Sequence, residues 1–274
     1  MRQVAELQER AGAWRDHLLP LVQQIASRDV GGILLGAFDG SAVVAFVYGF
    51  PGTYQGRSVL HSHMLTVDPR YRGRDLGYRL KVAQRSEALA RGVREITWTF
   101  DPLRSANAYL NVTRLGVVAV DYRVNYYGSD SSAPGALHIG TDRIWVQWLL
   151  DSERVVRRLR GGIPPVLLRP EAFALVRRGR GKKPDVSFPD SGEAVLAIEI
   201  PHEISTLQRS DPAAAKTWRE CTRAAFVDCF ARGYRLEEFV RTGAGEPAAE
   251  ESGSYLFEKP GLAATSAGVG EHLP

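Results

Sequence analysis

Apolar residues recur every three or four positions at the start of the chain, which is the spacing of one face of a helix. The positions that keep this spacing are Val4, Leu7, Ala11, Trp14, Leu18, Val22 and Ile25. Pro20 falls inside the run, and proline interrupts a helix. The pattern therefore predicts two amphipathic helices that meet at Pro20.

Three apolar runs follow, and each has the length and composition of a β-strand. The runs 32–38 and 41–48 are separated by Asp-Gly at 39–40, a pair that favours a tight hairpin turn. The third run covers 58–67 and ends at an Asp-Pro pair. We expect three strands here, the first two forming a hairpin.

Helix and strand patterns then alternate as far as residue 150. The expected elements are a helix over 78–91, a strand over 95–100, a helix over 106–115 and strands over 117–127 and 143–150. The order α, ββ, β, α, β, α, ββ predicts a mixed α/β fold for this part of the chain.

The pattern changes after residue 150, and the signal over 151–192 is mixed. A strand over 194–200 leads to the clearest helix of the chain, which begins at Asp211-Pro212 and ends at Gly233. Short strands over 235–241 and 255–258 follow. We expect a domain over residues 1–150, an α/β extension over 151–260 and a disordered tail over 261–274.

The net charge of the chain bears on its class of binding partner but does not identify that partner. The chain of 274 residues has 35 Lys and Arg against 31 Asp and Glu, a net charge of +4. This excess is too small to indicate nucleic acid, and it suits an anionic small ligand equally well. The basic run 177–183 has no interleaved aromatic residue, which favours a solvated loop over an RNA-binding segment.

Two further patterns bear on the compartment. The sequence has no apolar stretch of about eighteen residues and no apolar core behind its charged first residues, so we expect neither a membrane span nor a signal peptide. Cys221 and Cys229 are eight positions apart on one expected helix. That is about 12 Å along its axis, too far for a disulfide. These features predict a cytoplasmic protein.

The segment 61–77, HSHMLTVDPRYRGRDLG, carries the most specific chemistry. A strand runs into a Gly- and Arg-containing turn that opens a helix, and the free N–H groups of a helix start attract anions. Gly73 and Gly77 leave room for a phosphate, while Arg72 and Arg74 add positive charge. The turn is a candidate pyrophosphate site, with an ordinary Gly-rich turn as the alternative; it matches neither the Walker loop nor GxGxxG.

The stretch 67–77, VDPRYRGRDLG, together with the order of elements over about residues 30–150, resembles the GCN5-related N-acetyltransferase (GNAT) superfamily. In the superfamily signature R/Q-x-x-G-x-G/A, Arg72 takes the first position and Gly77 the last. Asp75 stands where the middle glycine belongs. A carboxylate beside a pyrophosphate weakens binding unless it turns away, but Asp tolerates a left-handed backbone better than most residues.

The resemblance implies the GNAT fold, a mixed and mostly antiparallel central sheet flanked by helices, here with a C-terminal βαβ extension. It also implies acetyl-CoA or another acyl-CoA as co-substrate. Backbone groups of Leu65, Thr66 and Val67 would bond the pantetheine arm and polarise the thioester carbonyl. The pyrophosphate would be held by the turn residues Arg72, Gly73, Arg74, Asp75, Leu76, Gly77 and Tyr78.

His61 and His63 are the candidate bases. Residues two apart on a strand point to the same face, and an imidazole that titrates near about 6.5 can remove a proton at neutral pH. Arylalkylamine N-acetyltransferases of the superfamily have a similar His-x-His at this offset from the glycine loop. The alternative is that both are hydrogen-bonded core histidines.

The resemblance does not identify the residue that gives a proton to the departing CoA thiolate. Alignment on Leu115-Gly116 puts Val112 where the superfamily has a Tyr. Tyr109, one turn earlier, could substitute for it or could pack on the sheet. Asn107 could bond the pantetheine or could be an ordinary surface residue. No Cys or His spacing indicates a metal site.

These observations favour an N-acyltransferase that moves an acetyl or other short acyl group from CoA to a primary amine of a small molecule. The full length resembles a bacterial subgroup of predicted acyltransferases, which implies succinyl-CoA and an amino-acid acceptor as one alternative. A non-catalytic acyl-CoA sensor is another, because Asp75 and Val112 depart from the signature. We expect no nucleic-acid or membrane partner; residues 151–260 could complete the acceptor pocket or form a homodimer interface.

Overall fold

The computed structural model describes residues 2–11, 18–128, 139–161, 171–179, 183–190, 192–242 and 252–260. The chain packs as two compact units. Unit 1 comprises Met1–Thr99, Leu115–Val117 and Trp145–Gly161, and unit 2 comprises Phe100–Arg114, Val118–Ile144 and Gly162–Pro274. The tail expected over 261–274 lies outside the described residues. The division at 150 and 260 that the sequence suggests stays a prediction.

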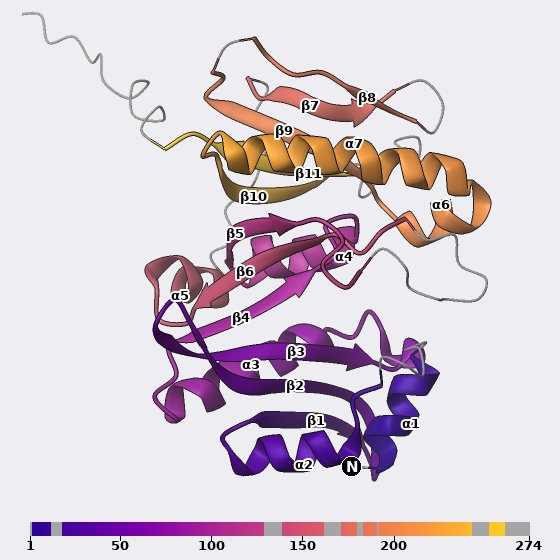
Figure 1. The fold of residues 1–274 in the computed structure, drawn as a ribbon. Coiled ribbons are helices and arrows are strands. Elements are labelled where there is room, and N and C mark those ends of the chain that lie inside the picture. The colour runs from indigo at the N-terminus through magenta and orange to yellow at the C-terminus, as the bar shows by residue number, and fades with distance from the viewer. Residues whose placement is uncertain are drawn as a thin grey trace, which may run out of the picture. The chain divides into compact units, whose positions relative to one another are not determined.

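Unit 1 is a sheet with helices on both faces (Figure 1). Its elements are α1 (Arg2–Arg10), α2 (Leu21–Asp29), β1 (Ile33–Asp39), β2 (Ala42–Tyr54), β3 (Arg57–Val67), the 3₁₀ turn η2 (Pro69–Tyr71), α3 (Leu76–Ala90), β4 (Glu95–Phe100), β6 (Arg143–Leu149) and α5 (Glu153–Leu159). Neighbouring strands run in the order β1-β2-β3-β4-β6. The first three are antiparallel, and β3 and β4 are parallel. The expected mixed sheet flanked by helices is confirmed.

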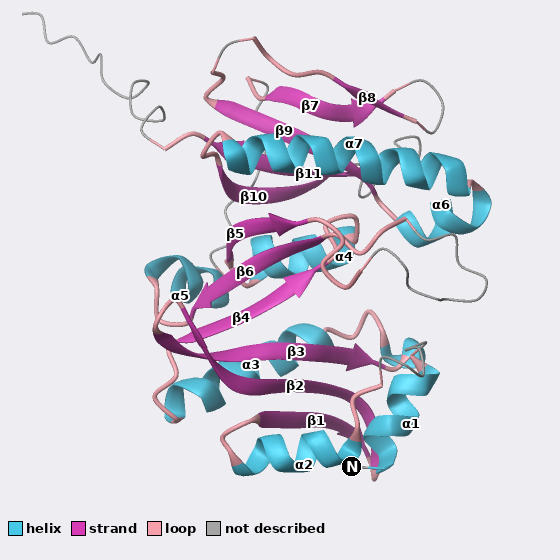
Figure 2. Cartoon of the chain, in the orientation of Figure 1, coloured by secondary structure: helices cyan, strands magenta, loops and turns pink. Residues whose placement is uncertain are grey.

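Alternation along β2 divides its side chains between two cores. Phe46 and Tyr48 pack with Val4 and Leu7 of α1. Ala45 and Val47 turn to the other face and pack under α3. Burying one such large apolar side chain stabilises the fold by about 1.5–3 kcal/mol. Figure 2 shows the result, with α1 and α3 on opposite faces of the strands.

The hairpin at Asp39-Gly40 is confirmed, and Gly40 takes φ +57°, which L side chains rarely adopt. The two helices that the sequence predicts on either side of Pro20 are present, and Pro20 is the N-cap of α2. The apolar spacing does not mark the buried face of α2, since Gln24 and Ser27 are buried while Val22 is 74% exposed. Residues 12–17, which include Trp14, lie outside the described part.

Unit 2 contains a second sheet with the strand order β10-β11-β9-β7-β8. Its elements are α4 (Ser105–Ala108), the π-helical turn η3 (Tyr109–Arg114), β5 (Val118–Arg123), β7 (Phe173–Arg178), β8 (Pro184–Val186), β9 (Val195–Pro201), α6 (Ile204–Ser210), α7 (Pro212–Ala231), β10 (Arg235–Thr242) and β11 (Ser252–Glu258). The helix α7 lies along this sheet (Figure 1), with Phe226 against Tyr255 and Phe257. The Asp211 carboxylate accepts from the Ala214 N–H and begins α7, as the sequence predicts.

Both sheets therefore belong to a mixed α/β protein. Cys221 and Cys229 are both free thiols, in agreement with their spacing. No helix in the described ranges combines the length and the apolar character that crossing a membrane requires.

Candidate functional site

One inserted residue in β3 sets the geometry of the site. The register between β2 and β3 pairs Tyr48 with Met64 and Gly49 with Ser62, which leaves His63 as the extra residue of a β-bulge. Alternation is interrupted at this point, because a bulge shifts every later side chain to the other face of the strand.

The contacts on each side follow this shift. Ser62 lies against α3, where its hydroxyl donates to Gln84 Oε1 at 2.8 Å. Met64 lies on the opposite face, in the core under α1, and Leu65 returns to the core under α3. Without the insertion, Met64 and Leu65 would exchange faces. The bulge therefore places His63 at the one position of β3 that is released from pairing with β2.

The structure brings His61 and His63 together on one face of the sheet. Their ring centroids are 6.5 Å apart, and Phe50 contacts both rings at 5.3 and 5.8 Å. His61 is held firmly, since its Nδ1 lies 3.0 Å from Thr97 Oγ1 and its ring stacks on Trp145 at 5.2 Å. His63 is exposed and has an edge contact with Tyr48.

The loss of solvent around its ring lowers the pKa of His63 from the usual value of about 6.5. His63 is therefore mainly neutral at pH 7 and able to accept a proton. His63 is exposed, whereas the ring of His61 is held by Thr97 and Trp145. The pair thus offers one accessible base and one oriented ring.

Beyond His61, β3 separates from its parallel neighbour. The pairing between β3 and β4 consists of Leu60 with Ile96 and His61 with Thr97. Pairing with β2 continues on the other side through Leu65, Thr66 and Val67. On the β4 side, the described strand pairs leave this last part of β3 without a partner. An open edge of backbone N–H and C=O groups therefore runs from the histidines to the end of the strand.

The open edge leads into a turn with two left-handed residues. Gly73 has φ +77° and Asp75 has φ +61°, and Asp75 is the N-cap of α3 with no side-chain capping bond. A Cβ added at Gly73 would meet no atom within 4 Å, so the space beside the turn is open. Asp75 thus keeps the backbone shape that a glycine would give, and Arg72 and Arg74 are exposed around it.

The base of the turn is fixed by ion pairs. Asp68 is buried, accepts from the Arg70 N–H and side chain, and bonds Arg10. These donors hold the pKa of the Asp68 carboxyl well below its usual range. The Tyr71 hydroxyl donates to Asp39 at 2.6 Å, and the Arg74 guanidinium lies 4.8 Å from the Tyr71 ring. The turn is therefore tied to the sheet on both sides.

Sequence reasoning missed a buried lysine beneath the site. Lys81 of α3 is 3% exposed, donates to Ser62 Oγ at 2.7 Å and lies 3.7 Å above the Trp98 ring. Burial lowers the pKa of Lys81 to about 7. The sequence pattern does not mark this burial, because Lys81 lies about 100° around α3 from Leu80 and outside the apolar face of Leu76, Leu80 and Ala83.

The other residues proposed from sequence lie in unit 2. Tyr109 begins the π-helical turn, and the Arg241 guanidinium lies 4.7 Å from its ring. Asn107 is exposed on α4, whereas Val112 is fully buried. Leu76, Gly77 and Tyr78 form the first turn of α3 in unit 1.

Two buried tryptophans lie near the histidines. Trp98 packs against Lys81 and Trp148 on the α3 side of the sheet. Trp145 stacks on His61 beside Tyr54. Among the described residues, no three His, Cys, Asp or Glu side chains gather as a metal site would require.

Residues 1–112 match the model of the Acetyltransferase (GNAT) family. No curated protein matches the chain.

Several solved acetyltransferases are similar to about half of the chain. The ribosomal-protein-S18-alanine N-acetyltransferase of Escherichia coli is 18% identical over 55% of this chain and 88% of that one, with a TM-score of 0.44. The aminoglycoside 6'-N-acetyltransferase of Enterococcus faecium is 18% identical over 56% and 91%, with a TM-score of 0.41. A GNAT family acetyltransferase of Elizabethkingia anophelis with acetyl-CoA bound is 15% identical over 53% and 88%, with a TM-score of 0.42. At these identities and scores, the alignments assign no role to any residue of this chain.

Proposed function

Because the N-terminal part of this chain belongs to the GNAT acetyltransferase family, we propose that the protein is an acyl-CoA-dependent N-acyltransferase acting on a primary amine of a small molecule. The observation that carries the proposal is the continuity of three features. An open strand edge starts beside His63, runs to Val67, and enters a left-handed turn that opens α3.

The chain offers a matching group for each part of an acyl-CoA. The open edge at Leu65, Thr66 and Val67 would hold the pantetheine arm by backbone hydrogen bonds, as an added strand. The first N–H groups of α3, with Arg72 and Arg74, would hold the pyrophosphate. The open space beside Gly73 fits this assignment, since a phosphate needs close approach to the backbone.

The thioester supplies an activated acyl carbon, and the residues of unit 1 prepare the amine. We assign His63 as the base, because it is exposed and mainly neutral at pH 7. The amine nitrogen forms a bond to the acyl carbon, the carbon–sulfur bond breaks, and the proton lost by nitrogen passes to His63 through water. His61, held by Thr97 and Trp145, would position the acceptor.

Two residues that the sequence suggests for this reaction fall in unit 2: Tyr109 as the proton donor to the thiolate and Asn107 as a pantetheine contact. Both stay predictions. The Arg241 guanidinium lies 4.7 Å from the Tyr109 ring within that unit.

A non-catalytic acyl-CoA sensor is the second candidate. Two observations favour it: Val112 is fully buried and brings no proton donor, and the Asp75 carboxylate stands at the start of α3. Such a protein would bind the thioester and leave it intact.

The test is release of CoA thiol from acetyl-CoA and succinyl-CoA in the presence of aryl amines, polyamines, amino acids and peptide N-termini. The proposal predicts amine-dependent release that is lost in His63→Ala. Release with succinyl-CoA and an amino acid alone would make the protein an N-succinyltransferase. Saturable binding without release for any pair would identify the sensor.

A further inference from the structure

A cluster of buried polar side chains lies under α3, on the face of the sheet opposite the histidines. Its members are Ser62 of β3 and Lys81 and Gln84 of α3, which are 5%, 3% and 0% exposed. The Lys81 Nζ donates to Ser62 Oγ at 2.7 Å, and the Ser62 hydroxyl donates to Gln84 Oε1 at 2.8 Å. We call these three residues the Ser62 cluster. It joins α3 to the residue that lies between His61 and His63 in the sequence.

Packing alone does not explain why this cluster is polar. Among the described residues, no carboxylate bonds Lys81, and the Gln84 Nε2 has no hydrogen-bond partner. Burial of such groups opposes folding. A partly satisfied polar network stabilises a fold less than apolar residues of similar size would. The Ser62 cluster therefore lowers the stability of unit 1, which is typical of residues that serve function.

The neighbouring strand leaves room for the cluster. Gly49 of β2 pairs with Ser62. A Cβ at Gly49 would lie 3.1 Å from Gln84 Nε2 and 3.0 Å from the His61 carbonyl oxygen, which is tighter than ordinary contact. Gly49 is not among the residues with positive φ, so its backbone conformation does not require glycine. The missing side chain instead allows Gln84 to approach β2 beside Ser62.

The Ser62 cluster lies at the point where the register between β2 and β3 changes. The two strands pair Gly49 with Ser62 and Tyr48 with Met64. His63 is the extra residue of the bulge between these pairs. If the bulge were lost while Met64 kept its partner, His63 would lie opposite Gly49 and face α3. Ser62 would then turn to the other face of the sheet and lose its bonds to α3.

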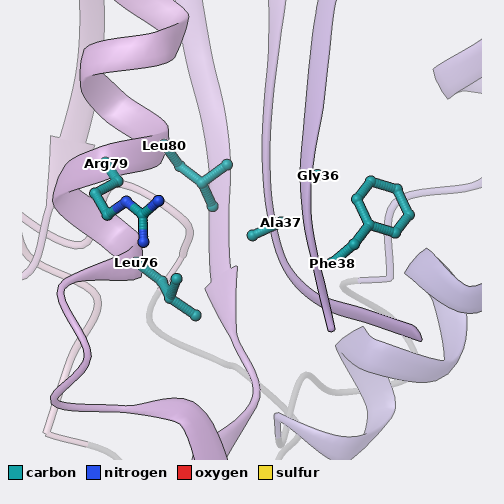
Figure 3. Close-up of a pocket in the computed structure, with 6 residues that line it drawn as sticks. All are labelled: Gly36, Ala37, Phe38, Leu76, Arg79 and Leu80. Carbon is teal, nitrogen blue, oxygen red and sulfur yellow. The ribbon is translucent and has the colours of Figure 1, made fainter. Parts of the chain in front are cut away.

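The apolar contact between α3 and β1 does not fix Ser62. Leu76 and Leu80 of α3 face Ala37 of β1 across a cavity of about 320 Å³ (Figure 3). β1 is separated from β3 by β2. This contact holds α3 on the sheet, whereas the position of the Ser62 hydroxyl depends on the hydrogen bonds within the cluster.

We propose that Ser62, Lys81 and Gln84 are positioning residues for His63. Their hydrogen bonds hold Ser62 on the α3 face, which selects the bulged register and keeps the His63 imidazole on the other face, beside His61. This inference rests on the proposed function, in which His63 accepts the proton of the amine. The three residues act through the backbone of β3 and not on the reacting atoms.

The test compares Ser62→Thr with Ser62→Val, because the two side chains have the same shape and only Thr keeps the hydroxyl. The NMR signal of the His63 ring, assigned by its loss in His63→Gln, is titrated in each full-length variant. We expect Ser62→Thr to keep the wild-type midpoint and Ser62→Val to shift it by about 0.5 pH unit or more, because the surroundings of the ring change. This measurement needs neither CoA nor turnover, so it is independent of the proposed function.

Release of CoA thiol with an accepted amine then connects the position of the ring with catalysis. At pH 7.5, Ser62→Val should lower kcat about tenfold or more and leave the KM for acyl-CoA within about twofold, while Ser62→Thr should keep most of the activity. If the wild type releases no thiol with any amine, the proposed function is wrong, and the titration of His63 alone decides whether the cluster positions the ring.

Two further variants separate positioning from stability. Lys81→Met removes the donor to Ser62 and should unfold at no lower temperature than the wild type near pH 6.5, yet shift the His63 midpoint. It keeps the test conclusive if Ser62→Val does not fold. Leu80→Ala should lower the unfolding temperature and leave the His63 midpoint unchanged. A wild-type midpoint in both Ser62→Val and Lys81→Met, or an equal shift in Ser62→Thr and Ser62→Val, would overturn the proposal.

Discussion

At the scale of single residues, the position of His63 is the feature on which the chemistry rests. The bulge releases it from the β2 register, and the neighbouring rings remove solvent from it. The sequence predicted two histidines on one face from their spacing, and the structure has both rings against Phe50. The inserted residue could not be identified from the sequence pattern, because the bulge is defined only by the pairing of β3 with β2.

His63→Ala should lower kcat/KM about 100-fold or more at pH 7.5, and much less at pH 9.5, where a larger share of the amine is already neutral. Because the pKa of His63 is lowered, the acidic limb of the wild-type profile should lie below pH 6.5, with activity rising as the ring loses its proton. The measurement is kcat/KM between pH 5.5 and 10.

His61→Asn provides the matched comparison, since an amide can keep the bond to Thr97. It should retain more activity than His63→Ala and leave the acidic limb in place. An equal loss for His63→Ala at pH 7.5 and 9.5 would contradict its assignment as the base.

Asp75 stands where the family signature has a glycine, and it adopts the left-handed backbone conformation that the turn requires at this position. Asp75→Gly should bind CoA about 3–10-fold more tightly, because it removes a carboxylate near the pyrophosphate and takes φ +61° without strain. Asp75→Asn separates the two effects, since Asn keeps the side-chain size and lacks the charge. Calorimetric titration with CoA measures the affinity of both variants. If neither variant differs from the wild type, the Asp75 carboxylate points away from the pyrophosphate.

At the scale of elements, α3 joins the anion site to the core beneath the histidines. Its first turn opens toward the turn residues, and Lys81 lies on its buried face against Ser62 and Trp98. No carboxylate bonds Lys81 among the described residues. A lysine in this setting is stable in its neutral form, which ties the stability of unit 1 to pH.

Lys81→Met should therefore be more stable than the wild type near pH 6.5, with the difference shrinking as pH approaches 10.5. The folded-state pKa of about 7 lies below the unfolded value of about 10.4, so protonation opposes folding and wild-type stability rises between these values. Urea unfolding of both proteins at pH 6.5, 8.5 and 10 measures the difference in their free energy of unfolding. Lys216→Met, at an exposed lysine of α7, should change the free energy of unfolding by the same amount at every pH. If the stability difference between Lys81→Met and the wild type is also constant with pH, the pKa of Lys81 is not lowered.

The elements that the sequence predicted well have strong local signals. Examples are the Asp-Gly hairpin, the strand at Glu95–Phe100 and the capped start of α7. The sequence signals were insufficient where packing between elements determines the structure. β7 pairs with β8 and also, in parallel, with β9, and α2 leaves Val22 74% exposed while it buries Gln24 and Ser27.

At the scale of the whole molecule, the family match covers residues 1–112, and this range includes the site residues of unit 1 other than Trp145. The turn at 70–77 and the following helix could be predicted because their glycines and arginines are adjacent in sequence. Phe50, Thr97 and Trp145, which hold the histidines, come from three other strands. No pattern in one sequence shows that they meet, so the surroundings of the site required the structure.

The central claim is that the open edge of β3 and the start of α3 bind a CoA thioester. Calorimetric titration of the full-length protein with CoA, acetyl-CoA and succinyl-CoA tests it most directly. We predict saturable heat with one site per chain, and a marked loss of affinity in Gly73→Val, which would strain the turn at φ +77°. A folded wild-type protein that gives no saturable heat with any of the three compounds would contradict the account.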